Sequence, residues 1–164
     1  MILPIKKWPD PILLKPCQEW DFNNPPAGLN RFISTDLLET LTHHQAYGLA
    51  ANQVGISYRV MAINISRSLG LTLMFNPELI DQSQEQYKNL EGCLSFPGTF
   101  LEIERAKTID VKWQDVNGVY HTETLHDMDA KCFLHELDHL NGRVYKDYIS
   151  DLKFNMALKK GKKR

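Results

Sequence analysis

The segment from Asp127 to Asn141 constrains the fold more than any other part of the sequence. Its apolar residues recur with a period of about 3.6 residues and cover nearly the whole circumference of an α-helix. A helix that is apolar on almost every side belongs in the middle of a domain, so other elements must surround it. Asp127 or Asp129 can cap its start, and Asn141-Gly142 can end it.

Three short segments that precede this helix predict β-strands. They are rich in β-branched or aromatic residues, and Gly, Pro, Asn or Asp bounds each of them. A hairpin turn follows the last segment, because Asn117-Gly118 can supply the positive φ angles of a tight reversal. The segments, which we expect to form an antiparallel meander, are residues 59–64, 71–75 and 108–113.

The N-terminal half adds an arm and a second helix. Six of the eight prolines lie in the first 26 residues, so this arm is expected to be extended or looped, not helical. From about Leu29, apolar residues recur at three- and four-residue spacing, which predicts an amphipathic helix that ends before Gly48. A length of 164 residues, 43% of them hydrophobic, suits one core. We predict a single α+β domain over residues 1–164, with antiparallel strands wrapped around the central helix and the second helix packed outside.

The charge of the chain is nearly balanced overall and strongly basic at the end. A net charge of −1 gives no general case for nucleic acid or an acidic membrane as the main partner. We expect residues from about 150 to 164 to form a short, solvated and frayed tail; the alternative is an electrostatic contact with an anionic surface. The cationic residues of this tail are Lys159, Lys160, Lys162, Lys163 and Arg164.

The cysteines indicate a reducing compartment. Cys17, Cys93 and Cys132 are odd in number and widely spaced, and no CxxC pair is present, so a disulfide framework is not expected. The first residues lack the apolar core of a signal peptide, and no apolar run approaches the length of a membrane span. We therefore expect a soluble, cytoplasmic protein with no membrane partner; location in an organelle is the alternative.

The motif HELDH, residues 135–139, points to a metal ion. On a helix, His135 and His139 project from one face and can bind the same ion. Glu136 lies about 100° around the helix, where its carboxylate can reach a metal-bound water without ligating the metal. The alternative is a pair of buried histidines that are satisfied by hydrogen bonds.

A third ligand must come from upstream. The residues after His139 contain no His, Glu or Cys and leave only Asp147 and Asp151 as anionic candidates. Cys93 is the most suggestive residue, because a flanking glycine allows close approach and a thiolate binds zinc or ferrous iron strongly. A buried small hydrophobe remains the alternative for Cys93. Cys132 would be cramped as a ligand on the same helix and is expected to pack in the core.

The stretch from Tyr47 to Gly55, YGLAANQVG, offers a further polar group. Small residues and two glycines between a helix and a strand form a tight connection by default. Gln53, if turned inward, can also donate its amide N–H to an oxyanion.

Three motifs in one order, GLAANQ, EGCLS and HELDH, make the chain resemble the peptide deformylase family. The resemblance covers nearly the whole chain, including Trp8-Pro-Asp-Pro11 and Phe75-Asn-Pro-Glu78. It implies that Cys93, His135 and His139 hold the metal ion.

The resemblance also implies the reaction, which removes the formyl group from the formyl-methionine start of new polypeptides and releases formate. Glu136 would take a proton from the attacking water. The amide of Gln53 and the backbone N–H of Leu94 would stabilise the tetrahedral oxygen. The residues that bind the extended substrate would be Gly48, Tyr47, Glu91 and Cys132.

The metal implied by the resemblance is ferrous iron, Fe²⁺. Zinc, nickel or cobalt (Zn²⁺, Ni²⁺, Co²⁺) can substitute, because a set of one cysteine and two histidines accepts several metals. The expected partners are N-formylmethionyl peptides and nascent chains, and the basic tail is compatible with weak ribosome contact. We expect a monomer.

Four positions depart from the usual pattern of the family and put substrate preference in question. Ala46 stands for a glycine, and Tyr47 replaces an aliphatic residue beside the methionine pocket. Phe100 stands where many members carry Arg, and Leu134 where many carry Gln. Two other functions are open: hydrolysis of other formyl or acyl amides, and a ribosome-binding module without activity. A module without activity predicts loss of a metal ligand or of the general base. The three ligand candidates Cys93, His135 and His139 and the candidate base Glu136 are all present.

Overall fold

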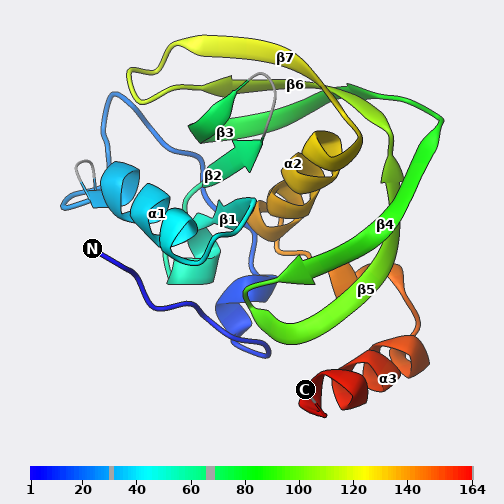
Figure 1. The fold of residues 1–164 in the computed structure, drawn as a ribbon. Helices are drawn as coiled ribbons and strands as arrows, with labels where there is room; N and C mark the ends of the chain where they lie inside the picture. Colours follow the sequence, from blue (N-terminus) through cyan, green and yellow to red (C-terminus); the bar gives the residue numbers. More distant parts are fainter. Residues whose placement is uncertain (30–31, 66–68, 164) are drawn as a thin grey trace.

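A central helix, α2 (Asp127–Leu140), is enclosed by antiparallel strands in the computed structural model, which describes residues 1–29, 32–65 and 69–163 (Figure 1). The larger sheet has the strand order β1-β2-β3-β6-β7, and the smaller sheet is the hairpin of β4 and β5. Neighbouring strands run antiparallel in both sheets. The strands are β1 (Gly48–Ala50), β2 (Val60–Ile65), β3 (Gly70–Gln82), β4 (Gln86–Cys93), β5 (Phe96–Ala106), β6 (Thr108–Gln114) and β7 (Tyr120–His126).

The predicted meander is confirmed in the larger sheet. The predicted segments 71–75 and 108–113 fall within β3 and β6, and segment 59–64 matches β2 except that Arg59 precedes the strand and Ile65 extends it. Central residues of all three strands pack against α2. The predicted turn joins β6 to β7: Gly118 has a φ of 79°, and the Asp115 N–H donates to the Val119 carbonyl oxygen at 2.9 Å.

The central helix is confirmed, but its predicted cap is wrong. Neither Asp127 nor Asp129 caps α2; the capping position is His126, which makes no side-chain cap. The chain passes directly from β7 into α2, and the His126 Nδ1 pairs with the Thr108 hydroxyl at 3.1 Å across the strands. The other end is as predicted, because Asn141 is the C-cap residue after Leu140 and the next residue, Gly142, has a φ of 72°.

Two helical elements lie on the N-terminal side. The predicted amphipathic helix is α1 (Phe32–His43), whose buried residues Ile33, Leu37 and Leu41 pack on the larger sheet. The arm is extended except for one 3₁₀ turn, η1 (Pro11–Leu14), which buries Leu13.

Two further 3₁₀ turns are η2 (Ala51–Val54) and η3 (Tyr145–Tyr148). No helix in the described ranges is long and apolar enough to cross a membrane.

The expectation of a frayed C-terminal tail is wrong. Residues Asp151–Lys162 form α3, and the Ser150 hydroxyl caps it by accepting from the Lys153 N–H. Phe154 is buried and packs edge-on against Phe96 of β5, which fixes the helix on the hairpin. Ala157 and Leu158 of α3 pack on the same apolar cluster. Apolar contacts and a cap therefore order a segment that its charge predicts to be a solvated tail. Arg164 lies outside the described residues.

Candidate metal centre and active site

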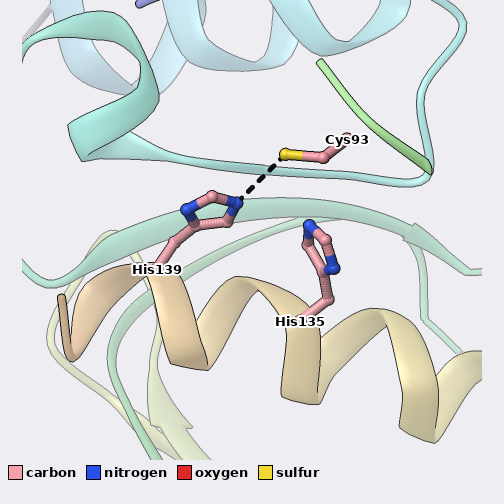
Figure 2. A group of neighbouring side chains, drawn as sticks. All are labelled: Cys93, His135 and His139. Atoms are coloured by element: carbon pink, nitrogen blue, oxygen red, sulfur yellow. Dashed lines mark hydrogen bonds between the residues drawn. The ribbon is translucent and has the colours of Figure 1, made fainter. Parts of the chain in front are cut away.

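The two histidines of HELDH lie close to Cys93, although the cysteine comes from a different element. His135 and His139 project from one face of α2, and Cys93 ends β4 (Figure 2). One ligand atom from each of the three residues lies within 4.8 Å of the others. The Cys93 Sγ and His139 Nε2 are 3.3 Å apart. The fold therefore forms a cluster of one sulfur and two nitrogens that could hold a single metal ion.

The two histidines have different surroundings. The Nδ1 of His135 lies 2.7 Å from the Glu91 Oε1, which leaves its Nε2 free to face Cys93. The Nδ1 of His139 is buried with no hydrogen-bond partner in the described part of the chain. Burial lowers the pKa of His139 well below its usual value, so this ring is neutral and able to ligate a metal.

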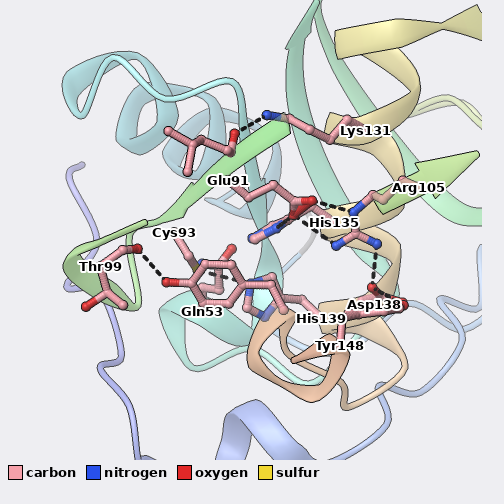
Figure 3. A network of polar contacts seen from close by, with 12 residues as sticks. Gln53, Glu91, Cys93, Thr99, Arg105, Lys131, His135, Asp138, His139 and Tyr148 are labelled. Atoms are coloured by element: carbon pink, nitrogen blue, oxygen red, sulfur yellow. Dashed lines mark hydrogen bonds and ion pairs between the residues drawn. The ribbon is translucent and has the colours of Figure 1, made fainter. Parts of the chain in front are cut away.

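A buried ionic network supports His135 from behind (Figure 3). Arg105 on β5 donates twice to Glu91, from Nε at 2.6 Å and from Nη2 at 2.9 Å. Its third hydrogen bond, from Nη1, reaches Asp138 of α2 at 2.9 Å, and the Tyr148 hydroxyl donates to the same carboxylate. Burial would raise the pKa of Glu91, but hydrogen bonds from His135 and Arg105 outweigh it and lower that pKa to about 2. Glu91 is therefore a carboxylate that fixes the ring of His135.

Glu136 is buried beside this cluster without a full set of partners. Its side chain is 4% exposed, and its Oε2 accepts no hydrogen bond from any described group. Burial raises its pKa to about 7, and the charge on His135 opposes that rise. Gly48 lies against it so closely that a Cβ on Gly48 would come within 2.6 Å of the Glu136 Cγ. Only glycine fits at position 48 without displacing this carboxylate.

The side chain of Gln53 turns inward, toward Cys93, which is one of the two orientations that the sequence allowed. Its Nε2 lies 3.4 Å from the Cys93 Sγ and 3.2 Å from the Ser95 Oγ, and its Oε1 accepts from the Ala50 N–H at 2.9 Å. The backbone N–H of Lys6, in the arm, donates to the Gln53 carbonyl oxygen at 2.7 Å. The amide is thus held at the cysteine end of the cluster.

The arm also holds the turn that contains Leu94. The Lys7 ammonium donates to the Leu94 carbonyl oxygen at 2.7 Å, and the Trp8 N–H donates to the Ser95 carbonyl oxygen at 2.9 Å. The proline-rich segment therefore fixes the geometry of the turn after Cys93.

The cluster opens into a cavity of about 990 Å³. Of the four positions that depart from the family pattern, Ala46, Tyr47 and Phe100 line it, whereas Leu134 belongs to the apolar core. Cys132 is not part of the metal cluster; its Sγ donates to the Tyr47 carbonyl oxygen at 3.1 Å. The predicted substrate-binding residues that line the cavity are Gly48, Tyr47, Glu91 and Cys132.

Sequence reasoning missed the supporting network and one wall of the cavity. Arg105, Asp138 and Tyr148 were not predicted, and neither was Lys131, which lines the cavity. A signal for Arg105 exists: it follows Leu101 and Ile103 at alternate positions of β5, so it faces the core. An arginine on a core-facing position predicts a buried carboxylate partner.

A thiol and two imidazoles around one point, with a buried carboxylate beside them, define the class of protein as a metallohydrolase. Comparisons with known proteins identify the family. Residues 2–155 match the model of the polypeptide deformylase family. A peptide deformylase of Bartonella henselae is 38% identical over 95% of this chain and 89% of its own length. One of Thermotoga maritima is 40% identical over 95% of this chain and 92% of its own.

Solved structures agree with these matches. The crystal structure of peptide deformylase from Ehrlichia chaffeensis superposes with a TM-score of 0.88 and 34% identity over 99% of this chain and 96% of that one. The Met-Ala-Ser-bound structure of a peptide deformylase from Acinetobacter baumannii superposes with a TM-score of 0.85 and 27% identity. The match covers 91% of this chain and 99% of that one. The chain belongs to the polypeptide deformylase family, whose members remove the N-formyl group from new peptides.

Proposed function

We propose that this protein removes the formyl group from N-formylmethionyl nascent chains, with a metal ion held by Cys93, His135 and His139. The observation that carries the proposal is the approach of these three ligand atoms to within 4.8 Å, beside a buried carboxylate at the wall of a peptide-sized cavity. The reaction yields formate and a peptide with a free amine.

The residues present fit a metal ion. A soft thiolate and two imidazoles suit zinc or ferrous iron, and Glu91 fixes the ring of His135 in the manner typical of metal-binding histidines. The neutral ring of His139, whose Nδ1 has no hydrogen-bond partner among the described residues, fits the same role. We propose ferrous iron as the natural ion, with zinc, nickel and cobalt as substitutes. When bound, such an ion supplies a Lewis acid that polarises the formyl carbonyl and lowers the pKa of water.

Glu136 is the proposed general acid and base. A pKa of about 7 allows it to accept a proton near neutral pH and to return that proton to the departing amide nitrogen. Its buried Oε2, which lacks a partner among the described groups, is the atom available for this transfer. Gly48 supports the role, since any larger residue would displace the carboxylate.

Two donors are proposed for the oxygen that becomes negative in the transition state. The Gln53 amide lies at the cysteine end of the cluster, and the Leu94 N–H belongs to the turn that the arm fixes. The peptide itself would lie extended against Gly48 of β1. Tyr47, Glu91 and Cys132 stay proposed as further residues of the substrate site, although the Glu91 carboxylate is already engaged by Arg105.

The substrates proposed here place the protein in the cytoplasm, where new chains emerge. The lysines of α3 support a weak contact with ribosomal RNA. We retain the proposal that the protein is a monomer and that residues 1–164 form one domain.

The test is anaerobic formate release from formyl-Met-Ala-Ser by protein loaded with Fe²⁺ or Ni²⁺. Glu136→Gln should lose at least about a hundredfold in kcat while it still binds the metal, because proton transfer is worth that much. Glu78→Gln, at an exposed position of β3, is the matched control and should keep full activity. Metal-loaded parent protein that releases no formate would contradict the proposal, and a panel of other formyl and acyl amides would then identify the reaction.

A further inference from the structure

Lys131 is a buried charge on the wall of the active-site cavity. It lies on α2, is 9% exposed and lines the cavity. Its ammonium donates to the Leu90 carbonyl oxygen on β4 at 2.6 Å (Figure 3). The ion pairs among the described residues do not include it. Burial lowers its pKa, and the nearby charge of Glu91 opposes that change.

An ammonium in this position has unused hydrogen-bonding capacity. The group carries three N–H donors, and one of them reaches Leu90. Buried charges in proteins are normally paired, because an unpaired one costs several kcal/mol. The remaining donors are therefore available to a ligand in the cavity, where an acceptor atom would compensate for the lost hydration.

The place of Lys131 relative to the cluster indicates which part of a substrate it meets. It lies four residues before His135, which is about one helical turn or 5–6 Å along α2. The side chain of methionine has about this length from its Cα. The neighbouring cavity residues on α2 and β4 are Leu90, Glu91, Met128, Asp129 and Cys132. The Glu91 carboxylate is already bonded to Arg105 and His135, and no hydrogen bond or ion pair among the described residues joins Asp129 to Lys131. A peptide whose formyl carbon sits at the cluster would thus bring the end of its first side chain to Lys131.

We propose that Lys131 makes this site accept formyl peptides whose first side chain ends in a strong acceptor oxygen, and methionine sulfoxide above all. This inference rests on the proposed deformylase function. Methionine sulfoxide keeps the length of methionine and places an S=O oxygen where the ammonium can donate. A thioether sulfur is only a weak acceptor, so unoxidised methionine gains less from the same group.

The reaction on such a substrate is the same hydrolysis. Water forms the new C–O bond to the formyl carbon, the C–N bond breaks, and the proton passes to the departing nitrogen. The sulfoxide is unchanged, so the step requires no oxidant or reductant. The products are formate and a peptide that begins with methionine sulfoxide.

The test compares kcat/KM for three synthetic peptides: formyl-Met-Ala-Ser, the same peptide with methionine sulfoxide, and the same peptide with norleucine. Norleucine has the length of methionine and no acceptor. Lys131→Met removes the donors and keeps the length and the burial, and Lys131→Arg keeps donors. Lys88→Met, on the exposed side of β4, is the matched control.

Parent protein and Lys88→Met should hydrolyse the sulfoxide peptide at a rate comparable to the methionine peptide. Lys131→Met should lower the ratio of sulfoxide to norleucine kcat/KM by about tenfold or more, the expected loss of a hydrogen bond from a charged donor, while Lys131→Arg retains part of it. An unchanged ratio in a folded Lys131→Met that still hydrolyses formyl-Met-Ala-Ser would overturn this inference alone. No hydrolysis of any peptide by the parent would instead overturn the proposed function.

Discussion

The two sheets that face α2 contact it in opposite ways. The larger sheet presents apolar side chains, among them Met61, Met74 and Val111, which are fully buried against the helix. The hairpin of β4 and β5 presents the charged pair Glu91 and Arg105, which is buried almost as completely. One helix therefore has an apolar side that forms the core and a polar side that forms the site.

The apolar contact and the ionic contact should therefore respond differently to mutation. When an apolar contact is truncated, the free energy of unfolding falls with the number of buried carbon atoms that are removed. A buried ionic network is stable only as a complete set, because removal of one member leaves an uncompensated charge. Mutations on the larger sheet should lower stability alone, whereas mutations on the hairpin should lower stability and metal affinity together.

The largest effect is expected for Arg105→Leu. It leaves Glu91 buried without its guanidinium partner, so the free energy of unfolding should fall by about 3–5 kcal/mol. Because Glu91 also orients His135, Ni²⁺ affinity should fall about 10–100-fold. Urea unfolding and chelator competition measure the two quantities. The matched control is Lys107→Leu, whose exposed pair with Glu85 should contribute nothing measurable.

On the other side of the helix, Ile109→Ala should cost about 3 kcal/mol of unfolding free energy through the cavity that it leaves. Ile109 is 1% exposed on β6 and packs in the cluster that contains α2. Ni²⁺ affinity and the kcat of the folded protein should not change. A fall in metal affinity as large as that of Arg105→Leu would show that the two sides of α2 are not independent.

The same division explains what the sequence could predict. Strands β2, β3 and β6 are rich in β-branched or aromatic residues and have clear bounds, so these three strands of the larger sheet could be predicted from the sequence. The hairpin was not predicted, because Arg105 takes a core position and interrupts the apolar signal. The three metal-binding candidates follow from residue type and motif, but Asp138 and Tyr148 come together only through the tertiary fold. The local pattern of β5 indicates that Arg105 needs a buried partner, but no local pattern indicates which residues supply it.

Cys17, which is buried on the apolar side of α2, should make the stability of the protein depend on pH in alkaline solution. Burial in the cluster around α2 raises its pKa from 9.0 to about 11, and Arg59 opposes the rise. The folded state therefore keeps the thiol neutral where the unfolded chain ionises. The free energy of unfolding is therefore unaffected by this thiol below pH 9. It falls by about 2 kcal/mol as the pH rises from 9 to 11, because the unfolded chain loses the thiol proton first. Cys17→Ala should remove this part of the decline in urea midpoint, and identical alkaline slopes in both proteins would contradict it.

The smallest effect is expected for Gly161→Ala, where α3 meets the hairpin. A Cβ at position 161 would come within 2.6 Å of the Gly98 carbonyl oxygen, so α3 or the loop must shift. Overpacking of this kind costs about 1–3 kcal/mol, and the better helix propensity of alanine returns up to about 1, which leaves a net loss near 1 kcal/mol.

Because Pro97, Gly98 and Thr99 line the cavity, the KM for formyl-Met-Ala-Ser should rise a fewfold. The kcat should stay unchanged, since α2 and Cys93 hold the reacting groups and neither contacts Gly161. Lys160→Ala, one residue earlier on the exposed face of α3, is the control and should alter neither constant. If Gly161→Ala lowers kcat and leaves KM unchanged, α3 acts on the ionic side of α2 and not on the wall of the cavity, and the polar region must then extend into the C-terminal helix.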